Sequence, residues 1–178
     1  MKLFWAPTSP YVRKVMVVAH EAGVADRLTP IETTPQAVVA DVGAANPLAQ
    51  IPALEIAPGE WIYDSLVIAE YLDSVGGGGL FPTPGPARWT ALRRHALGHG
   101  VIDLGNQELN MRRLPSEEQS PTLAAKRRAA LGRALDALET EAPGLATDAP
   151  TIGEIAIACG LFYLDFRFPE TPWRPERP

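Results

Sequence analysis

A hydroxyl side chain stands where a short apolar strand is expected to give way to a helix. Ser9 follows the apolar segment 2–5 and precedes apolar residues at helical spacing, a run that ends near Gly23. The first turn of a helix carries unpaired backbone N–H groups and the positive end of the helix dipole, so it stabilises a nearby anion. A thiolate is such an anion, and thiols at helix N-termini are acidified. The segment predicts a site that activates a thiol, although Ser9 followed by Pro10 is also an ordinary helix cap.

A second group of polar side chains lies on one predicted helix of the second half. His95, His99 and Asp103 are spaced four residues apart, which places them on one helical face. Such side chains can ligate a metal, but no further ligand is evident near them, so a solvated or capped pair of histidines is the simpler interpretation. We therefore predict no metal site.

Two further features, a pair of residues and a lone cysteine, have structural interpretations. Thr151 and Glu154 have the spacing of a capping box, so we expect them to start a helix rather than to take part in chemistry. Cys159 stands in an apolar run and is expected to be a small core residue. Because it is the single cysteine, it excludes an internal disulfide or a cysteine-rich metal site and fits a reducing compartment.

The elements that must position Ser9 alternate between strands and helices. Pro30 suits an edge strand, and the pair Asn46-Pro47 ends the helix before it. After the first strand and the helix that ends near Gly23, the predicted elements are a strand at 27–32, a helix at 36–45, strands at 53–56 and 60–63, and a helix at 65–75.

Four consecutive glycines and a proline-rich stretch then mark a domain boundary. We predict a first domain at 1–78, a linker at 76–86 and a second domain at 86–178. The second domain is predicted to be all helical, with helices at 87–113, 121–141 and 151–166, the first of them bent near Gly98 to Gly105.

Composition narrows the function classes. The 178 residues are 46% hydrophobic and 21% charged, enough for a core in one domain or two small ones. The net charge of −5 gives no electrostatic footprint for nucleic acid. There is no signal peptide and no apolar run long enough to span a membrane, so we expect a cytoplasmic protein without membrane or nucleic-acid partners. The arginines on the predicted helices, Arg93, Arg94, Arg112 and Arg113, are expected to be solvated.

Four groups of residues, taken together, resemble a known family. They are the run Ser9 to Val15; Asn46-Pro47-Leu48 with Ile51-Pro52-Ala53-Leu54; Asp64-Ser65 with Ile68, Tyr71 and Leu72; and Thr151-Ile152-Gly153-Glu154 with Ile155-Ala156. In this order they are similar to the soluble glutathione transferases of the bacterial type, over residues 1 to about 166. The resemblance implies the glutathione transferase fold, an α/β thioredoxin-like N-terminal domain followed by an all-α C-terminal domain, usually as a homodimer.

The resemblance also implies glutathione as co-substrate. Ser9 would stabilise its thiolate, and a cis bond before Pro52 would leave the backbone of Ile51 free to pair with its peptide groups. Ser65 would bind the γ-glutamyl carboxylate and Asp64 would lie near the ammonium group, although this pair is equally typical of an ordinary cap. The implied glutathione-binding residues are Ser9, Gln50, Ile51, Pro52, Asp64 and Ser65.

The same resemblance has three further implications, of which the first is a departure from the family pattern. Gln50 stands where many relatives carry a basic residue, so it would donate to the glycyl carboxylate without charge. The second substrate, a small hydrophobic electrophile, binds between the domains in this family, and Tyr11, His99 and Asp103 are the candidates to contact it. Ser9 and Val12 occupy the positions of the two cysteines of a dithiol enzyme, which excludes thioredoxin-like redox exchange.

The implied function is glutathione S-transfer in detoxification, with reductive and lyase reactions of the same site left open. The alternative is a non-catalytic adaptor that kept the fold and lost the chemistry. The family normally adds one or more helices after the last one predicted here, and this sequence does not contain them, so that either the chain is truncated or a disordered tail is not included. We therefore expect the apolar helix 155–166 to expose part of its surface.

Overall fold

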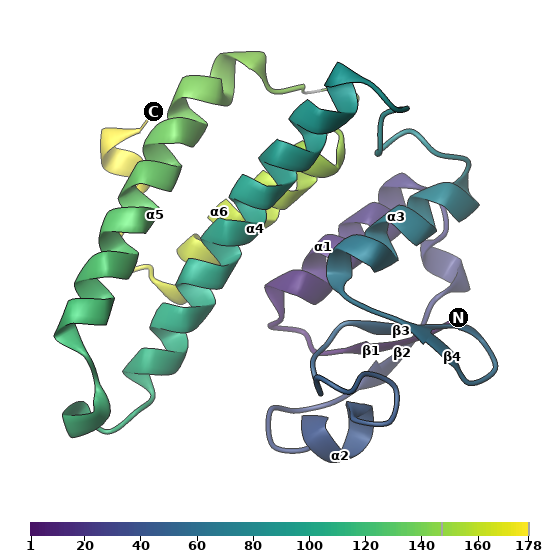
Figure 1. Cartoon of the computed structure of the whole chain (residues 1–178), viewed down its shortest axis with the longest axis horizontal. Coiled ribbons are helices and arrows are strands. Elements are labelled where there is room, and N and C mark those ends of the chain that lie inside the picture. The colour runs from purple at the N-terminus through teal and green to yellow at the C-terminus, as the bar shows by residue number, and fades with distance from the viewer. Residues whose placement is uncertain (147, 178) are drawn as a thin grey trace. The chain divides into compact units, whose positions relative to one another are not determined.

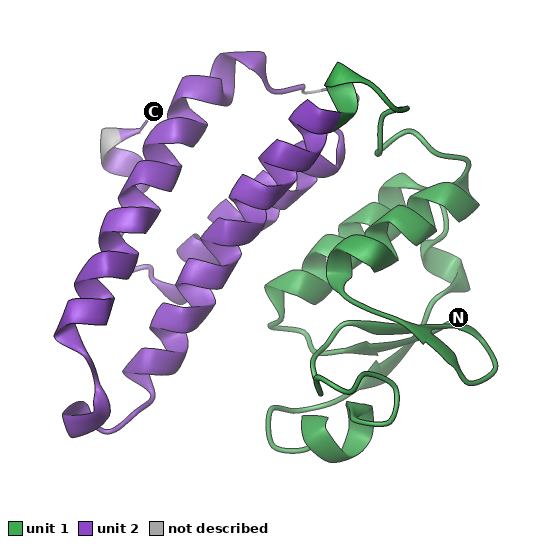
Figure 2. Cartoon of the chain, viewed as in Figure 1, with its two compact units in different colours: residues 1–88 green, residues 89–178 purple. Residues whose placement is uncertain are grey.

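The computed structural model describes residues 1–146 and 148–177, with the backbone alone for Glu176. Contacts between residues divide the chain into two compact units, residues 1–88 and 89–178 (Figures 1 and 2). The first unit contains a sheet with helices, and the second consists of helices and short connections. None of the described helices combines the length and the apolar character needed to cross a lipid bilayer.

A four-stranded sheet forms the centre of the first unit. Its strands are β1 (Lys2–Trp5), β2 (Thr29–Glu32), β3 (Ala53–Ala57) and β4 (Glu60–Ile62), shown in Figure 1. The order across the sheet is β2-β1-β3-β4, with β2 parallel to β1 and the other neighbours antiparallel. Pro30 therefore lies in an edge strand, as predicted, where a missing N–H is tolerated.

Helices cover both faces of this sheet. They are α1 (Pro10–Glu21), α2 (Val38–Val42) and α3 (Ser65–Gly76), with a short 3₁₀ helix η1 (Ala25–Arg27) after α1. α1 and α3 pack against each other on one side of the sheet, and α2 lies on the other (Figure 1). Since successive strand residues face opposite ways, Phe4 and Ala53 join Val42 of α2 in one apolar cluster, whereas the fully buried Leu3 and Leu54 face the other side.

One detail of the first unit differs from the sequence-based expectation. α2 is shorter than the predicted helix at 36–45, because the carbonyl of Thr34 accepts the N–H groups of Ala37 and Val38 in a turn. The glycine- and proline-rich segment after α3 is anchored to that helix. The buried carboxylate of Asp73 accepts hydrogen bonds from the N–H of Leu80 (3.1 Å) and of Phe81 (3.0 Å).

Three long helices form the second unit: α4 (Pro86–Arg112), α5 (Pro121–Glu141) and α6 (Ile152–Arg167). The connections contain the 3₁₀ helices η2 (Ser116–Glu118) and η3 (Ala142–Gly144). The predicted helices are confirmed to within one residue at each end. α4 is one continuous helix through Gly98, and the bend expected near Gly98 to Gly105 stays a prediction. A Cβ at Gly98 would lie 2.4 Å from the backbone nitrogen of Ile157, so this glycine lets α4 and α6 approach closely.

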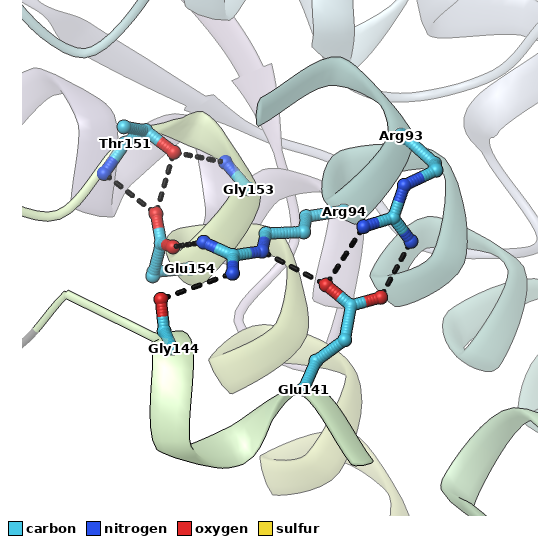
Figure 3. A network of polar contacts seen from close by, with 7 residues as sticks. All are labelled: Arg93, Arg94, Glu141, Gly144, Thr151, Gly153 and Glu154. Carbon is cyan, nitrogen blue, oxygen red and sulfur yellow. Dashed lines mark hydrogen bonds and ion pairs between the residues drawn. The ribbon is translucent and has the colours of Figure 1, made fainter. Parts of the chain in front are cut away.

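Arg94 joins the three helices of the second unit (Figure 3). Its guanidinium donates to Glu141 of α5 (Nε–Oε2, 2.9 Å), to Glu154 of α6 (Nη1–Oε1, 2.7 Å) and to the carbonyl of Gly144 (3.0 Å). The expectation that Arg94 is solvated is wrong, because its side chain is only 16% exposed. The N–H donors of its guanidinium are paired with carboxylates of residues far away in the sequence. Helical periodicity does not indicate such partners.

The capping box at the start of α6 is confirmed and belongs to the same network (Figure 3). Thr151 Oγ1 accepts from the N–H of Gly153 (3.1 Å), and Glu154 Oε2 accepts from the N–H of Thr151 (2.9 Å). Burial raises the pKa of Glu154, but hydrogen bonds from Thr151 and the charge of Arg94 outweigh it and leave that pKa below its usual value. Glu154 is therefore held as a carboxylate.

The last described residues fold back onto α5 and α6 and include the 3₁₀ helix η4 (Arg174–Glu176). The indole N–H of Trp173 donates to Asp165 of α6 (2.9 Å), and the guanidinium of Arg177 donates to Asp136 of α5 (2.5 Å). The expectation that α6 leaves apolar surface exposed is confirmed, since Phe162 is 51% and Phe166 is 50% exposed.

Candidate functional site

Three segments of the first unit meet at one edge of the sheet. The strand register pairs Phe4 with Ala53 and Leu54 with Ile62. Because β3 is antiparallel to both neighbours, its beginning lies beside the ends of β1 and β4. The turn after β1, the loop before β3 and the turn after β4 therefore lie at the same edge. These segments hold the six predicted glutathione-binding residues, Ser9, Gln50, Ile51, Pro52, Asp64 and Ser65.

Ser9 is the N-cap of α1. Its Oγ accepts a hydrogen bond from the N–H of Val12 (3.3 Å), and its own N–H donates to the carbonyl of Ala6 (3.1 Å). Within the described part of the chain, no acceptor receives the Ser9 O–H. The same side chain can thus cap the helix through its oxygen and donate its proton to a ligand, so the two interpretations of Ser9 are compatible.

Asn46 shapes the loop that precedes β3. Its buried side chain donates to the carbonyl of Gln50 (2.8 Å) and accepts from the N–H of Leu48 (3.0 Å). The peptide bond between Ile51 and Pro52 is cis, which confirms the prediction. The sequence analysis placed Asn46 in a recognised motif without giving it a role; an asparagine before a proline is typical of a turn built on its side chain.

The backbone of Ile51 is available at this edge. Its side chain packs against the apolar cluster that contains Phe4 and Val42. Among the described residues, neither its N–H nor its C=O has a hydrogen-bond partner. An extended peptide can pair with such a backbone as an additional strand would. The neighbouring Gln50 side chain is exposed and can donate to an incoming group.

The start of α3 holds a buried polar group. Asp64, which follows a cis bond from Tyr63, caps the helix by accepting from the N–H of Leu66 (3.0 Å). Ser65 is only 1% exposed, and its Oγ has no hydrogen-bond partner among the described residues. A buried hydroxyl left unpaired costs about 1–3 kcal/mol, so a ligand acceptor at this position would be favoured. The helix N-terminus favours an acceptor with negative charge.

This arrangement fits a short peptide with two anionic groups. The N-termini of α1 and α3 each favour one anion, and the backbone of Ile51 offers a donor and an acceptor for a peptide unit at the same sheet edge. A thiolate at Ser9 and a carboxylate at Ser65 would satisfy both ends.

The three candidates for contact with an electrophile belong to two helices. Tyr11 lies in the first turn of α1, and His99 and Asp103 lie in α4. His99 Nε2 is 3.7 Å from Asp103 Oδ1, and the rings of His95 and His99 stack with centroids 5.4 Å apart, so the predicted shared face exists. Over the described residues, no group of three or more His, Cys, Asp or Glu side chains could hold a metal ion. Contact with an electrophile stays a prediction.

Comparison with protein families gives two matches. Residues 8–75 match the glutathione S-transferase N-terminal domain, and residues 121–178 match the glutathione S-transferase C-terminal domain. The first match includes all three segments at the sheet edge, and the second includes α5, the capping box and α6.

Individual relatives extend over nearly the whole chain. YibF of Escherichia coli K12, an uncharacterized GST-like protein, is 32% identical over 181 residues, which covers 100% of this chain and 89% of YibF. A glutathione transferase family member from Pseudomonas fluorescens Pf-5, solved with bound glutathione, is 40% identical with a TM-score of 0.93, covering 99% of this chain and 88% of that one. A second structure from that organism, with bound S-(propanoic acid)-glutathione, is 39% identical with a TM-score of 0.89 and covers 100% and 89% of the two chains.

Proposed function

Since the chain belongs to the glutathione S-transferase family, we propose that it binds reduced glutathione and adds it, as a thiolate, to small apolar electrophiles. In this reaction the glutathione sulfur forms a bond to the electrophilic carbon, and the leaving group departs with the electron pair of the bond that breaks. The relative from Pseudomonas fluorescens with bound S-(propanoic acid)-glutathione supports the proposal, because that ligand is a glutathione thioether.

The observation that carries the proposal is the buried, unpartnered hydroxyl of Ser65. It lies at the N-terminus of α3, on the same sheet edge as Ser9 and the backbone of Ile51. A γ-glutamyl carboxylate at Ser65 would satisfy the hydroxyl, and the glutathione peptide would then reach past Ile51 toward Ser9. Gln50 would donate to the glycyl carboxylate without charge, and Asp64 would attract the ammonium group.

Ser9 and the first turn of α1 could together stabilise the glutathione thiolate enough for the chemical step. A free thiol has a pKa of about 8.5, and lowering that pKa by two units takes about 2.7 kcal/mol. The N-terminus of a helix supplies up to about 2 kcal/mol, and a hydrogen bond to a charged acceptor supplies about 1.5–3 kcal/mol. The hydroxyl of Ser9 and the first turn of α1 together suffice, without a histidine or lysine beside the sulfur.

A non-catalytic adaptor with the same fold is the alternative function, and the uncharged Gln50 is the observation that favours it. The proposal also includes a homodimer, with Tyr11, His99 and Asp103 as contacts of the electrophile. Titration with glutathione tests binding first. A ligand at 100 times its dissociation constant stabilises a protein by about 2.7 kcal/mol, so the melting temperature should rise clearly.

Ser65→Ala sharpens this test. The substitution removes a buried hydroxyl that has no partner in the free protein, so the stability of the free protein should stay the same or rise. Glutathione affinity, measured by calorimetry, should fall about 10- to 100-fold, which is the value of a charged hydrogen bond. An unchanged affinity, or a free protein destabilised by more than about 1 kcal/mol, would assign Ser65 to the fold rather than to the ligand.

A further inference from the structure

The loop between α2 and β3 is held by one buried side chain. Its other side chains are largely exposed, those of Pro47, Leu48 and Gln50 among them, so packing against the core does little to fix the loop. Asn46 is only 2% exposed, and its N–H donates to the carbonyl of Val42, the last residue of α2 (2.8 Å). The conformation of the loop therefore depends on the hydrogen bonds that Asn46 makes.

Asn46 closes the loop through three hydrogen bonds. Its side-chain amide donates to the carbonyl of Gln50 (Nδ2–O, 2.8 Å), and its side-chain oxygen accepts from the N–H of Leu48 (3.0 Å). Its backbone carbonyl accepts from the N–H of Ala49 (2.8 Å). A single residue thus pairs with backbone groups of three successive loop residues.

The loop is strained at Ala49. This residue has a φ of 49°, and among the residues that the structure describes it is the one non-glycine residue with a positive φ. An alanine adopts the left-handed region roughly 5- to 30-fold less readily than the right-handed one, because its Cβ approaches a carbonyl oxygen. Such a conformation persists only where the surrounding contacts impose it, and it is frequent at ligand-binding sites. The hydrogen bonds of Asn46 are contacts of this kind.

The hydrogen bond from Asn46 to Gln50 also sets the direction of the Ile51 N–H. The peptide bond between Gln50 and Ile51 is trans and planar, so its C=O and N–H point in opposite directions. Because the C=O points to the buried amide of Asn46, the N–H of Ile51 must point away from that amide. This N–H has no partner among the described residues, and it is the group that would pair with the glutathione peptide.

We propose that Asn46 is a positioning residue for glutathione, an inference that rests on the proposed function because it concerns the same site. Asn46 acts through the loop. It keeps Ala49 in the left-handed region and so presents the N–H of Ile51 to a carbonyl of the glutathione peptide. The free protein already has the conformation that binds, so little affinity is lost to ordering the loop.

Asn46→Ala tests this role, because it removes both side-chain hydrogen bonds of the loop. Ala49 can then leave the left-handed region, and only the molecules in which it stays there would bind. Glutathione affinity, measured by calorimetry, should therefore fall about 5- to 30-fold. The thiol pKa of bound glutathione should stay as in the parent, because Ser9 lies on another segment.

Thr33→Val is the matched control for a loss of stability. It removes the hydrogen bond from the buried hydroxyl of Thr33 to Asp41 of α2 (Oγ1–Oδ2, 2.7 Å), which lies in the same unit. Its melting temperature should fall, but its affinity for glutathione should equal that of the parent.

Ala49→Gly provides a rescue that a purely structural role of Asn46 does not predict for affinity. Glycine adopts the left-handed region without strain, so it can keep the loop conformation when the amide of Asn46 is missing. Adding Ala49→Gly to Asn46→Ala should strengthen glutathione binding at least about threefold, and the same change in the parent should have a smaller effect.

The inference is overturned if Asn46→Ala binds glutathione as tightly as Thr33→Val does, or if Ala49→Gly restores none of the lost affinity. If Asn46→Ala does not fold, Asn46→Ser takes its place. The serine hydroxyl can still accept from the N–H of Leu48 in a turn, but it is too short to replace the amide at Gln50, so the same loss of affinity is expected.

Ser65→Ala distinguishes a failure of this inference from a failure of the proposed function. If Ser65→Ala weakens glutathione binding and Asn46→Ala does not, the role of Asn46 is wrong and the proposed site stands. A parent protein that does not bind glutathione overturns both.

Discussion

The carboxyl group of Glu141 has a pKa lowered to about 2, chiefly by hydrogen bonds from Arg93, with burial opposing and Arg94 adding to the effect. Arg93 contacts it through two nitrogens, at 2.5 Å and 2.9 Å (Figure 3). A charge held this way links α4 to the end of α5. We therefore expect the pH dependence of stability to depend on Glu141.

The sign of that dependence follows from the direction of the shift. Because the pKa of Glu141 is lower in the folded chain than in the unfolded chain, the unfolded chain binds more protons at acidic pH. The contribution of Glu141 is complete above about pH 5 and is lost as the pH falls toward about 2. Urea unfolding of Glu141→Gln across this range should show a flatter loss of stability than the parent.

The control for this prediction is Glu139→Gln, on the same helix, where the carboxylate has no ion pair among the described residues. It should keep the steep acid dependence of the parent. If Glu141→Gln and Glu139→Gln have parallel stability curves between about pH 2 and pH 5, the account of this network is wrong.

At the scale of secondary-structure elements, the start of α6 depends on Thr151. Its backbone N–H and its hydroxyl both donate to Glu154, and the hydroxyl oxygen accepts from the N–H of Gly153. Thr151→Ala should lower the free energy of unfolding by about 0.5–2 kcal/mol, as the loss of an N-cap does. Glutathione affinity should not change, because Thr151 lies outside the first unit.

Ser120→Ala provides the comparison for that variant. Ser120 caps α5 with a single exposed hydrogen bond of 3.3 Å to the N–H of Leu123, so its loss should be smaller. The measurement is the urea midpoint of both variants at constant slope. A midpoint of Thr151→Ala that equals the parent value, or a larger loss for Ser120→Ala, would show that the network adds nothing to the cap.

The contact between α4 and α6 depends on the absence of a side chain at Gly98. A Cβ there would meet the backbone nitrogen of Ile157 at 2.4 Å and the carbonyl carbon of Ala156 at 2.5 Å. Gly98→Ala must push the helices apart and should cost about 1–3 kcal/mol or more, although alanine favours helices. Gly132→Ala, where a Cβ meets open space, should instead stabilise the chain by up to about 1 kcal/mol. Thermal unfolding that ranks the two variants the other way would contradict this packing.

Most elements could be predicted from the sequence because their signals are local. Apolar residues at helical spacing and capping residues place α5 at its observed bounds, and Pro-Gly at 58–59 places the turn between β3 and β4. α2 was overestimated, since the competing turn at Thr34 is set by backbone hydrogen bonds. Ion pairs between residues far apart in the sequence could not be predicted. Arg94 and Glu154 are separated by 60 residues, and the periodicity of the sequence does not indicate such pairs.

At the scale of the whole molecule, the candidate site also combines features that local sequence signals predict with features that depend on long-range contacts. Ser9 and Asp64 are caps that local spacing identifies, and the cis bond before Pro52 followed from the resemblance to the family. That their segments share one edge follows from the antiparallel register of β3, which the sequence does not state. The folding of the segment 168–177 back onto α5 was not predicted, because Arg177 finds its partner Asp136 at a separation of 41 residues.

The central claim is that Ser9 stabilises the thiolate of bound glutathione, and the thiol pKa of the bound molecule tests it directly. This pKa can be measured from the ultraviolet absorbance of the thiolate as the pH is raised. The parent should hold the thiol pKa well below the free value of about 8.5. Ser9→Ala should raise it by about 1–2 units, because a hydrogen bond to a charged acceptor is worth about 1.5–3 kcal/mol.

Two further measurements, a rate and an affinity, accompany that pKa. The rate against a chloronitrobenzene should fall about 10- to 100-fold in Ser9→Ala, while glutathione affinity stays nearly unchanged. Thr8→Ala is the neighbouring control and should match the parent. A bound thiol whose pKa is the same in the parent and in Ser9→Ala, or a parent that binds glutathione with the thiol pKa of the free molecule and no activity, would contradict the claim and favour the adaptor.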